Sequence, residues 1–388
     1  MNANWNYPTA IRVGAERLSE LGECCRDLDM RSPLLVTDPG LAALPMVGQA
    51  RDACVEAGLV CKVFSEIQPN PTGTNVDAGV SAFNQGSHDG VIALGGGSAL
   101  DAGKAIALMA RQSVSLWDLE DVGDNWTRAD ASLIAPIVAV PTTAGTGSEV
   151  GRASVILDEA REVKKIIFHP LMVPKIVILD PVVTVGLPAA LTGATGMDAL
   201  SHSLEAWCSP AYHPMAEGIA IEGIRLVREF LPQAVADGSD LEARTQMLVA
   251  STMGATAFQR GLGAMHALAH PLGALYNAHH GTLNAVLMPY VLQANRLVIE
   301  ARITRLARAI GIANPGFDTF LDWILQLRET LQIAPDLAEL GIDDSEAARI
   351  GEMAKADPSS GTNPLPFSAS EYQALFLRAL NGNLEAGA

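Results

Sequence analysis

A change of sequence pattern near residue 184 divides this chain into two halves that fold differently. Before it, short β-rich runs alternate with helical stretches, which is typical of βαβ units around a parallel sheet. From Pro188 onward, long helical runs follow one another with few convincing strands. Glycine and proline mark the change of period at Thr184–Pro188. We therefore predict an α/β domain over residues 1–184 and an all-α domain over residues 185–388.

Apolar runs of strand length and the helical stretches between them define the first half. The predicted buried strands are Pro33–Asp38, Val60–Phe64, Gly90–Leu94, Ile137–Val140 and Ile176–Leu179. Helices are predicted over Ala42–Ala57 and Val76–Gln85, and in the second half over Gly196–Cys208, Met215–Leu231, Leu241–Phe258 and Leu297–Ile310. The expected N-terminal fold is Rossmann-like, an open parallel sheet with helices on both faces.

Composition restricts the classes of function. The 388 residues are 49% apolar, which is enough for two cores. No apolar run approaches the ~18 residues of a membrane-spanning helix, and Met1–Pro8 lacks the features of a signal peptide, so we expect a cytoplasmic protein that does not bind membranes. The net charge of -17 disfavours nucleic acid as a partner. The five cysteines form no Cys-x-x-Cys pair, so any metal should have nitrogen and oxygen ligands.

Two polar loops follow predicted strands of the first half. Gly95-Gly-Gly-Ser98 lies between a strand and a helix, where glycines allow close approach of a ligand and free N–H groups face an anion. This suits a pyrophosphate, although three glycines also make an ordinary tight turn, and the G-x-G-x-x-G fingerprint is absent. The second loop, Pro141–Glu149, follows Ile137–Val140 at a carboxyl end, which is the edge where open α/β sheets bind ligands.

Asp38 ends another predicted strand, where a carboxylate can bond ribose hydroxyls and would repel a 2′-phosphate. This position favours NAD over NADP. A helix cap or turn before Pro39-Gly40 explains the same aspartate equally well.

Four of the eight histidines lie within Gly263–Gly281. His266 and His270 are four residues apart, so they share one face of a helix. Pro271 should kink or end that helix near His270, and a short connection then leads to His279-His280. A single histidine in an apolar helix is usually a hydrogen-bonded core residue, but four in one segment favour a metal or proton-transfer site.

Asp198 and His202 repeat the spacing of four on a second, otherwise small and apolar helix. Such a pair is commonly a surface interaction, but polar groups on a buried face need a partner. One carboxylate with two or three imidazoles suits Fe(II), Mn(II), Co(II) or Zn(II). The spacing alone does not choose between His270 and His280 as a ligand.

Four motifs occur in order along the chain and together resemble the iron-containing (group III) alcohol dehydrogenase family. They are Gly95-Gly-Gly-Ser98-x-x-Asp101-x-x-Lys104, Pro141-Thr-Thr-x-Gly-Thr-x-x-Glu149, Ala194-Thr-Gly-Met-Asp198-Ala-Leu-x-His202-x-x-Glu205, and Gly263-x-x-His266-x-x-Ala-His270 ending in His280-Gly281. The resemblance covers nearly the whole chain and includes Pro69-Asn70-Pro71 and Asn363-Pro364. It implies a dehydroquinate synthase-like architecture, with a dinucleotide-binding α/β domain followed by a helical metal-binding domain.

The resemblance also implies roles for individual residues. It makes Asp198, His202, His266 and His280 the ligands of Fe2+, with Zn2+ or another divalent ion as the alternative, and it leaves His270 near the nicotinamide as a proton carrier. For NAD it implies the residues Asp38, Asn70, Gly96, Gly97, Ser98, Asp101, Thr142, Thr143 and Lys164.

The sequence departs from the family pattern at three positions. Gly151 stands where threonine is usual, and Ala153 stands where a larger side chain often lies, so a reshaped substrate pocket is expected. His279 replaces a proline that often precedes the last ligand, which leaves open whether it replaces or assists His280.

The expected function is reversible hydride transfer between a primary or secondary alcohol, including a diol or hydroxy acid, and NAD. The expected partners are a small alcohol or aldehyde and further copies of the chain, as a homodimer or larger homo-oligomer. Two rivals remain: a lyase of the dehydroquinate synthase type that uses NAD and a metal, and a catalytically silent nucleotide-binding protein.

Overall fold

The structure, a computed structural model, describes residues 9–384, so Met1–Pro8, on which the argument about a signal peptide depends, lies outside the described part. The described chain divides into two compact units, residues 9–187 and 188–384.

Residues 9–187 form an open parallel sheet of six strands in the order β1-β8-β5-β4-β2-β3. The strands are β1 (Ala10–Val13), β2 (Pro33–Val36), β3 (Lys62–Phe64), β4 (Gly90–Gly95), β5 (Ile137–Pro141) and β8 (Ile176–Leu179). All five pairings are parallel. β2, β4, β5 and β8 are buried along their whole length, which explains their continuous apolar sequences.

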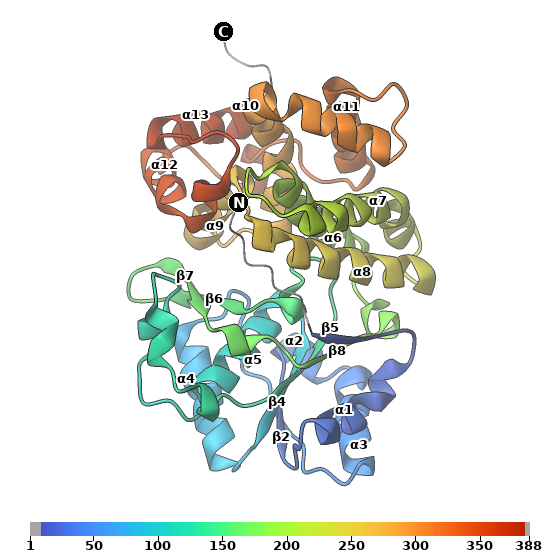
Figure 1. Ribbon diagram of the computed structural model, residues 1–388, viewed down its shortest axis with the longest axis vertical. Helices are drawn as coiled ribbons and strands as arrows, with labels where there is room; N and C mark the ends of the chain where they lie inside the picture. The colour runs from blue at the N-terminus through green and yellow to red at the C-terminus, as the bar shows by residue number, and fades with distance from the viewer. Residues whose placement is uncertain (1–8, 385–388) are drawn as a thin grey trace. The chain divides into compact units, whose positions relative to one another are not determined.

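Helices cover both faces of this sheet (Figure 1). They are α1 (Leu21–Asp27), α2 (Pro39–Ala42), α3 (Pro45–Glu56), α4 (Gly73–Gln85) and α5 (Gly97–Met109). α1 and α3 bury apolar residues such as Leu21 and Val47 with Leu35, Ile92 and Val138 of the strands, and α5 packs on β4 and β5 from the other side. The predicted fold class is confirmed.

Residues 188–384 contain helices and no strand. The α-helices are α6 (Ala189–Cys208), α7 (Pro214–Ala236), α8 (Leu241–Ala257), α9 (Ala264–Tyr276), α10 (His280–Ala309), α11 (Phe317–Thr330), α12 (Ala347–Ala356) and α13 (Ala369–Leu380). α6 is the central helix of this unit, since it packs against α7, α8 and α10 and is buried almost continuously from Thr192 to Cys208. Polar side chains on such a helix must find partners inside the protein.

The structure differs from the sequence-based prediction in several elements, including the short, partly exposed strand β1, which was not predicted. An antiparallel hairpin of β6 (Ala153–Asp158) and β7 (Val163–Phe168) was not predicted, because its strands are only half buried and β7 carries two lysines. Pro271 was predicted to kink or end a helix near His270, and the end is wrong, since α9 runs through Pro271 to Tyr276. Proline removes one backbone hydrogen bond, but buried residues on both sides, such as Leu268 and Leu272, keep the helix packed.

α10 begins at His280, well before the predicted Leu297. Its first half is almost entirely buried, so it lacks the amphipathic period that identifies a helix from sequence. Among the described helices, none combines the length and apolar character needed to cross a bilayer.

Candidate metal centre and nucleotide-binding loops

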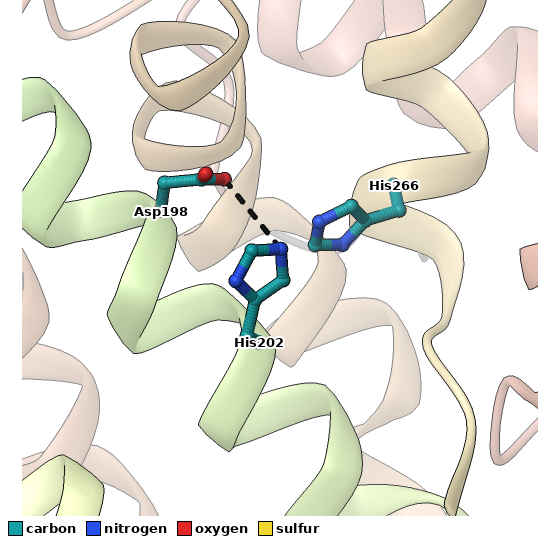
Figure 2. Close-up of side chains that lie close together, drawn as sticks. All are labelled: Asp198, His202 and His266. Atoms are coloured by element: carbon teal, nitrogen blue, oxygen red, sulfur yellow. Dashed lines mark ion pairs between the residues drawn. The ribbon is translucent and has the colours of Figure 1, made fainter. Parts of the chain in front are cut away.

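Asp198, His202 and His266 converge on one point inside the helical unit. Figure 2 shows Asp198 and His202 projecting from α6 toward His266 of α9. One donor atom from each residue lies within 4.8 Å of the others, and all three residues are buried. His202 Nε2 is 4.0 Å from Asp198 Oδ1. The spacing of four on α6 therefore places carboxylate and imidazole on the same face.

His280 joins this group from the first turn of α10. Its Nε2 lies 3.6 Å from Asp198 Oδ1, and its ring centroid lies 5.2 Å from that of His266. Gly281 explains the close approach of the helices, because a Cβ atom there would lie 2.3 Å from the backbone oxygen of Ala194 on α6. Only a residue without a side chain lets α10 lie directly against the backbone of α6 beside Asp198.

Glu205, one turn beyond His202 on α6, fixes the orientation of His266. Its carboxylate accepts a hydrogen bond of 2.7 Å from His266 Nδ1 and two more from the backbone N–H groups of Gly263 and Met265. Because a carboxylate only accepts, Nδ1 carries the proton and Nε2 presents its lone pair. This is the arrangement in which histidine ligands are held in metalloproteins.

The charge balance of the cluster favours a cation. Burial tends to raise the pKa of Asp198, but the imidazoles of His202, His280 and His266 and a hydrogen bond from Asn284 lower it to about 2. Burial tends to lower the pKa of His266, yet Glu205 and Asp198 raise it above its ordinary value. An ionised carboxylate among imidazole nitrogens is a donor set that fits a divalent transition metal.

His270 lies beside this cluster and has its own carboxylate. Its Nδ1 is 2.7 Å from Asp357 Oδ2, and its ring stacks on that of His280 with 5.5 Å between centroids. Asp357 also accepts a hydrogen bond from the backbone N–H of Ser359. Burial tends to raise the pKa of Asp357, while His270 and Ser359 lower it. Sequence reasoning missed Asp357, whose only local signal is that of an aspartate capping a helical turn before Pro358.

His279 has a structural partner of its own. It is the N-cap of α10, where its Nδ1 accepts a hydrogen bond from the backbone N–H of Thr282. Capping α10 is therefore a sufficient structural role for His279, and a role as a metal ligand is not needed to explain it.

In residues 9–187, three loops that follow adjacent strands lie at one edge of the sheet. β2, β4 and β5 are neighbours and parallel, so the loops at Asp38, Gly96 and Thr142 all leave their carboxyl ends. A hydrogen bond from Thr142 N to Gly95 O joins two of these loops. The sheet thus gathers segments that are distant in sequence at the edge that binds ligands in such folds.

The two predicted phosphate-binding loops pack against each other through glycine. A Cβ atom at Gly97 would lie 2.6 Å from Cγ2 of Thr146, and one at Gly96 would lie 3.4 Å from Cγ2 of Thr143. Gly96 is also the N-cap of α5 and offers no side chain to the first amides of that helix. A helix start of this kind is an anion-binding arrangement.

Asp38 serves as a helix cap and lies next to the glycine loop. Its Oδ1 accepts a hydrogen bond from Leu41 N at the start of α2, while Oδ2 would lie 3.6 Å from a Cβ atom at Gly95. The capping interpretation is therefore correct, and the other oxygen still faces the loop. Both roles that the sequence allowed are compatible with this geometry.

Lys164 and Asn70 are brought together by the hairpin. Lys164 Nζ donates a hydrogen bond of 2.7 Å to Asn70 Oδ1. Burial lowers the pKa of Lys164 to about 8, although Asp101 favours its charged form. A half-buried ammonium whose hydrogen-bond partner is a neutral amide gains from an anion in its vicinity.

Asp101 holds the loops in place through contacts within the protein. Its carboxylate accepts hydrogen bonds from Ser148 Oγ and from Val155 N, and it lies 3.2 Å from Lys104 Nζ. Lys104 also donates to the backbone oxygen of Ala153. Asp101 thus connects α5 with the second loop and with β6.

Comparison with known proteins agrees with both halves of this description. Residues 8–181 match the family described as iron-containing alcohol dehydrogenase, and residues 192–380 match the C-terminal family of the Fe-containing alcohol dehydrogenases. A 4-hydroxybutyrate dehydrogenase of Cupriavidus necator is 38% identical over 385 residues, covering 96% of this chain and 99% of that protein.

Solved structures agree as well. A 1,3-propanediol oxidoreductase superposes with a TM-score of 0.93 at 35% identity, covering 98% of this chain and 100% of the other. A sulfoacetaldehyde reductase of Bifidobacterium kashiwanohense, solved with NAD+, has a TM-score of 0.88 at 28% identity and covers 98% and 99% of the two chains. With both family matches and these full-length relatives, the chain belongs to the iron-containing alcohol dehydrogenase family and is an alcohol dehydrogenase.

Proposed function

We propose that this enzyme catalyses reversible hydride transfer between NAD and the primary alcohol group of a short alcohol, diol or hydroxy acid. The reaction uses a divalent metal ion as cofactor, and Fe(II) is the first candidate. The observation that carries the proposal is the buried cluster of one carboxylate and imidazole donors, in a chain whose other unit carries two glycine- and hydroxyl-rich loops at the ligand-binding edge of a parallel sheet. The NAD+ complex of the Bifidobacterium relative supports the choice of cofactor.

Asp198, His202, His266 and His280 would hold the metal. When bound, the ion supplies Lewis acidity toward the substrate oxygen. Glu205 keeps the lone pair of His266 Nε2 directed at the site. His270, held by Asp357, would take up the proton that the alcohol group loses and pass it toward solvent.

For NAD, we assign the pyrophosphate to the start of α5, with Gly96, Gly97 and Ser98, beside Thr142 and Thr143. Asp38 is assigned to the ribose hydroxyls, which favours NAD over NADP. Asn70 and Lys164 complete the nucleotide site as a hydrogen-bonded pair. Asp101 acts through Ser148, whose loop it holds.

The proposed substrate class is based on the substrates in the names of the relatives. 4-Hydroxybutyrate and 1,3-propanediol both end in a primary alcohol group. The small residues Gly151 and Ala153 are the positions at which we expect this enzyme's pocket to differ.

The test is to chelate the purified enzyme, restore Fe(II) under anaerobic conditions or Zn(II), and follow NADH formation with short primary alcohols, diols, hydroxy acids and secondary alcohols. We expect NADH only after metal is restored, and more from primary than from secondary alcohols. The proposal fails if the metal-loaded enzyme forms no NADH with any member of the panel, or if the chelated enzyme is fully active.

We further propose a cytoplasmic homodimer or larger homo-oligomer. Light scattering coupled to size-exclusion chromatography measures the assembly directly, and a monomer at micromolar concentration would contradict it.

A further inference from the structure

Asn284 touches three of the four proposed ligands of the metal centre. It lies four residues after His280 on α10, so the two side chains share a face, and it is completely buried. Its Nδ2 is 2.9 Å from Asp198 Oδ1, 3.1 Å from His280 Nε2 and 3.3 Å from His266 Nε2.

These three contacts cannot all persist beside a metal ion. An amide NH2 group has two hydrogens to donate. Each imidazole Nε2 has a single lone pair, which a metal bond consumes, whereas a carboxylate oxygen has more than one. Asp198 Oδ1 is therefore the one acceptor that can bind an ion and keep the hydrogen bond from Asn284.

The carbonyl oxygen of the Asn284 side chain indicates that packing alone does not explain why an asparagine occupies this position. Its Oδ1 is buried and has no hydrogen-bond partner among residues 9–384. A buried carbonyl without a partner is costly, and an apolar residue of similar shape would avoid that cost. Proteins accept such a cost where a residue has a functional task.

We propose that Asn284 is a positioning residue of the metal centre, whose amide N–H holds Asp198 Oδ1 and fixes the direction in which that carboxylate faces the ion. The hydrogen bond also withdraws electron density from Oδ1, which leaves the bound ion a stronger Lewis acid. This role rests on the metal site of the proposed function, but it is tested without turnover.

The experiment compares Asn284→Leu with a matched variant, Asn295→Leu. Asn295 is also a buried amide of α10, bonded to Val291 O and Asn363 Oδ1, and it lies ~16 Å further along the helix. For each chelated protein, Co(II) is titrated in, and both the dissociation constant and the visible absorption bands are recorded. The bands report the symmetry and number of ligands around the ion.

We expect Asn284→Leu to raise the Co(II) dissociation constant ~10–100-fold, as the loss of an outer partner does in metal sites, and to shift the bands. Asn295→Leu should lower the melting temperature while leaving both metal readouts unchanged. A wild-type dissociation constant and spectrum in Asn284→Leu would overturn the role of Asn284 alone. If that variant does not fold, Asn284→Ala, which only removes atoms, decides by the same criteria. Absence of Co(II) binding by the wild type would overturn the metal centre as well.

Discussion

In residues 188–384 the proposed metal site consists of side-chain donor atoms, whereas in residues 9–187 the proposed pyrophosphate site depends on the backbone of the glycine loop. Asp198, His202, His266 and His280 contribute the donor atoms of their side chains. The glycine loop instead requires residues without side chains, because a Cβ atom at Gly97 would clash with Thr146. The helical site should therefore be damaged by removing atoms and the nucleotide site by adding them.

The largest effect is expected from His266→Ala, which removes a donor and leaves Glu205 buried without its imidazole partner. We expect loss of bound metal and a fall in kcat/KM on the order of 10⁴-fold, because Lewis-acid assistance is worth several kcal/mol. Metal analysis and NADH assays measure both. His279→Ala, which removes only the cap of α10, is the control and should keep its metal. Full activity of His266→Ala after chelation would contradict the metal assignment.

His270→Ala should have the next largest effect and should separate proton transfer from metal binding. General acid–base help is typically worth ~10²–10⁴-fold, so kcat should fall by that factor while metal content stays at the wild-type level. Asp357→Asn should reproduce part of the fall, because it weakens the hold on His270. Loss of metal in His270→Ala would show that His270, not only His280, is a ligand.

Glu205→Gln tests whether the orientation of a donor matters as well as its presence. The amide has one acceptor oxygen in place of the two that now serve His266 Nδ1 and the amides of Gly263 and Met265. The metal dissociation constant should rise ~10–100-fold, with NAD binding unchanged. Competition with a chelator of known affinity measures the metal dissociation constant, and an unchanged value would mean that His266 is held by packing alone.

Gly97→Ala adds one methyl group to the other site and should spare the metal. Relieving the contact requires the Thr146 side chain to rotate or the two loops to separate, at a cost of ~1–3 kcal/mol, so NAD should bind ~10–100-fold more weakly. Fluorescence titration with NADH measures this. Gly48→Ala, on α3, adds the same methyl group into open space and is the matched control. Equal NAD affinity in the two variants would remove the loop from the cofactor site.

The smallest effect is expected for Lys164, a residue assigned to the NAD site whose charge changes near neutral pH. Burial lowers its pKa to about 8, so the cation is lost as pH rises through 8, and NAD affinity should fall in the same range. Lys164→Met should bind NAD about tenfold more weakly at pH 7, the worth of one charge-assisted hydrogen bond, and should show no pH dependence from pH 7 to 9. A parallel pH dependence in wild type and variant would exclude Lys164 as the cause.

The same difference between the units explains what the sequence could predict. The central strands β4 and β5 are continuous apolar runs followed at once by glycine or hydroxyl residues, so strand and loop were identified together. Asp198 and His202 were paired by helical spacing alone. Local sequence carries both signals.

Contacts between distant segments were not predictable in the same way. The partner of His270 lies 87 residues away, and Asn284 meets Asp198 across 86 residues. Spacing could not choose between His270 and His280, because the turn at Asn277-Ala278 decides where α10 begins. At Pro271 the local sequence favoured the end of a helix, but tertiary packing outweighed that preference and α9 continues.

The contact of Gly281 with the backbone of Ala194 has a consequence for ion choice. Side chains can rotate to suit ions of different radius, but two helices in direct backbone contact cannot come closer, and α10 moves away only by breaking its packing on α6. The separation of the backbones that carry His280 and Asp198 is thereby set by this contact. The packing of α10 on α6 therefore limits the positions that these two side chains can offer to an ion, whatever residues surround the substrate.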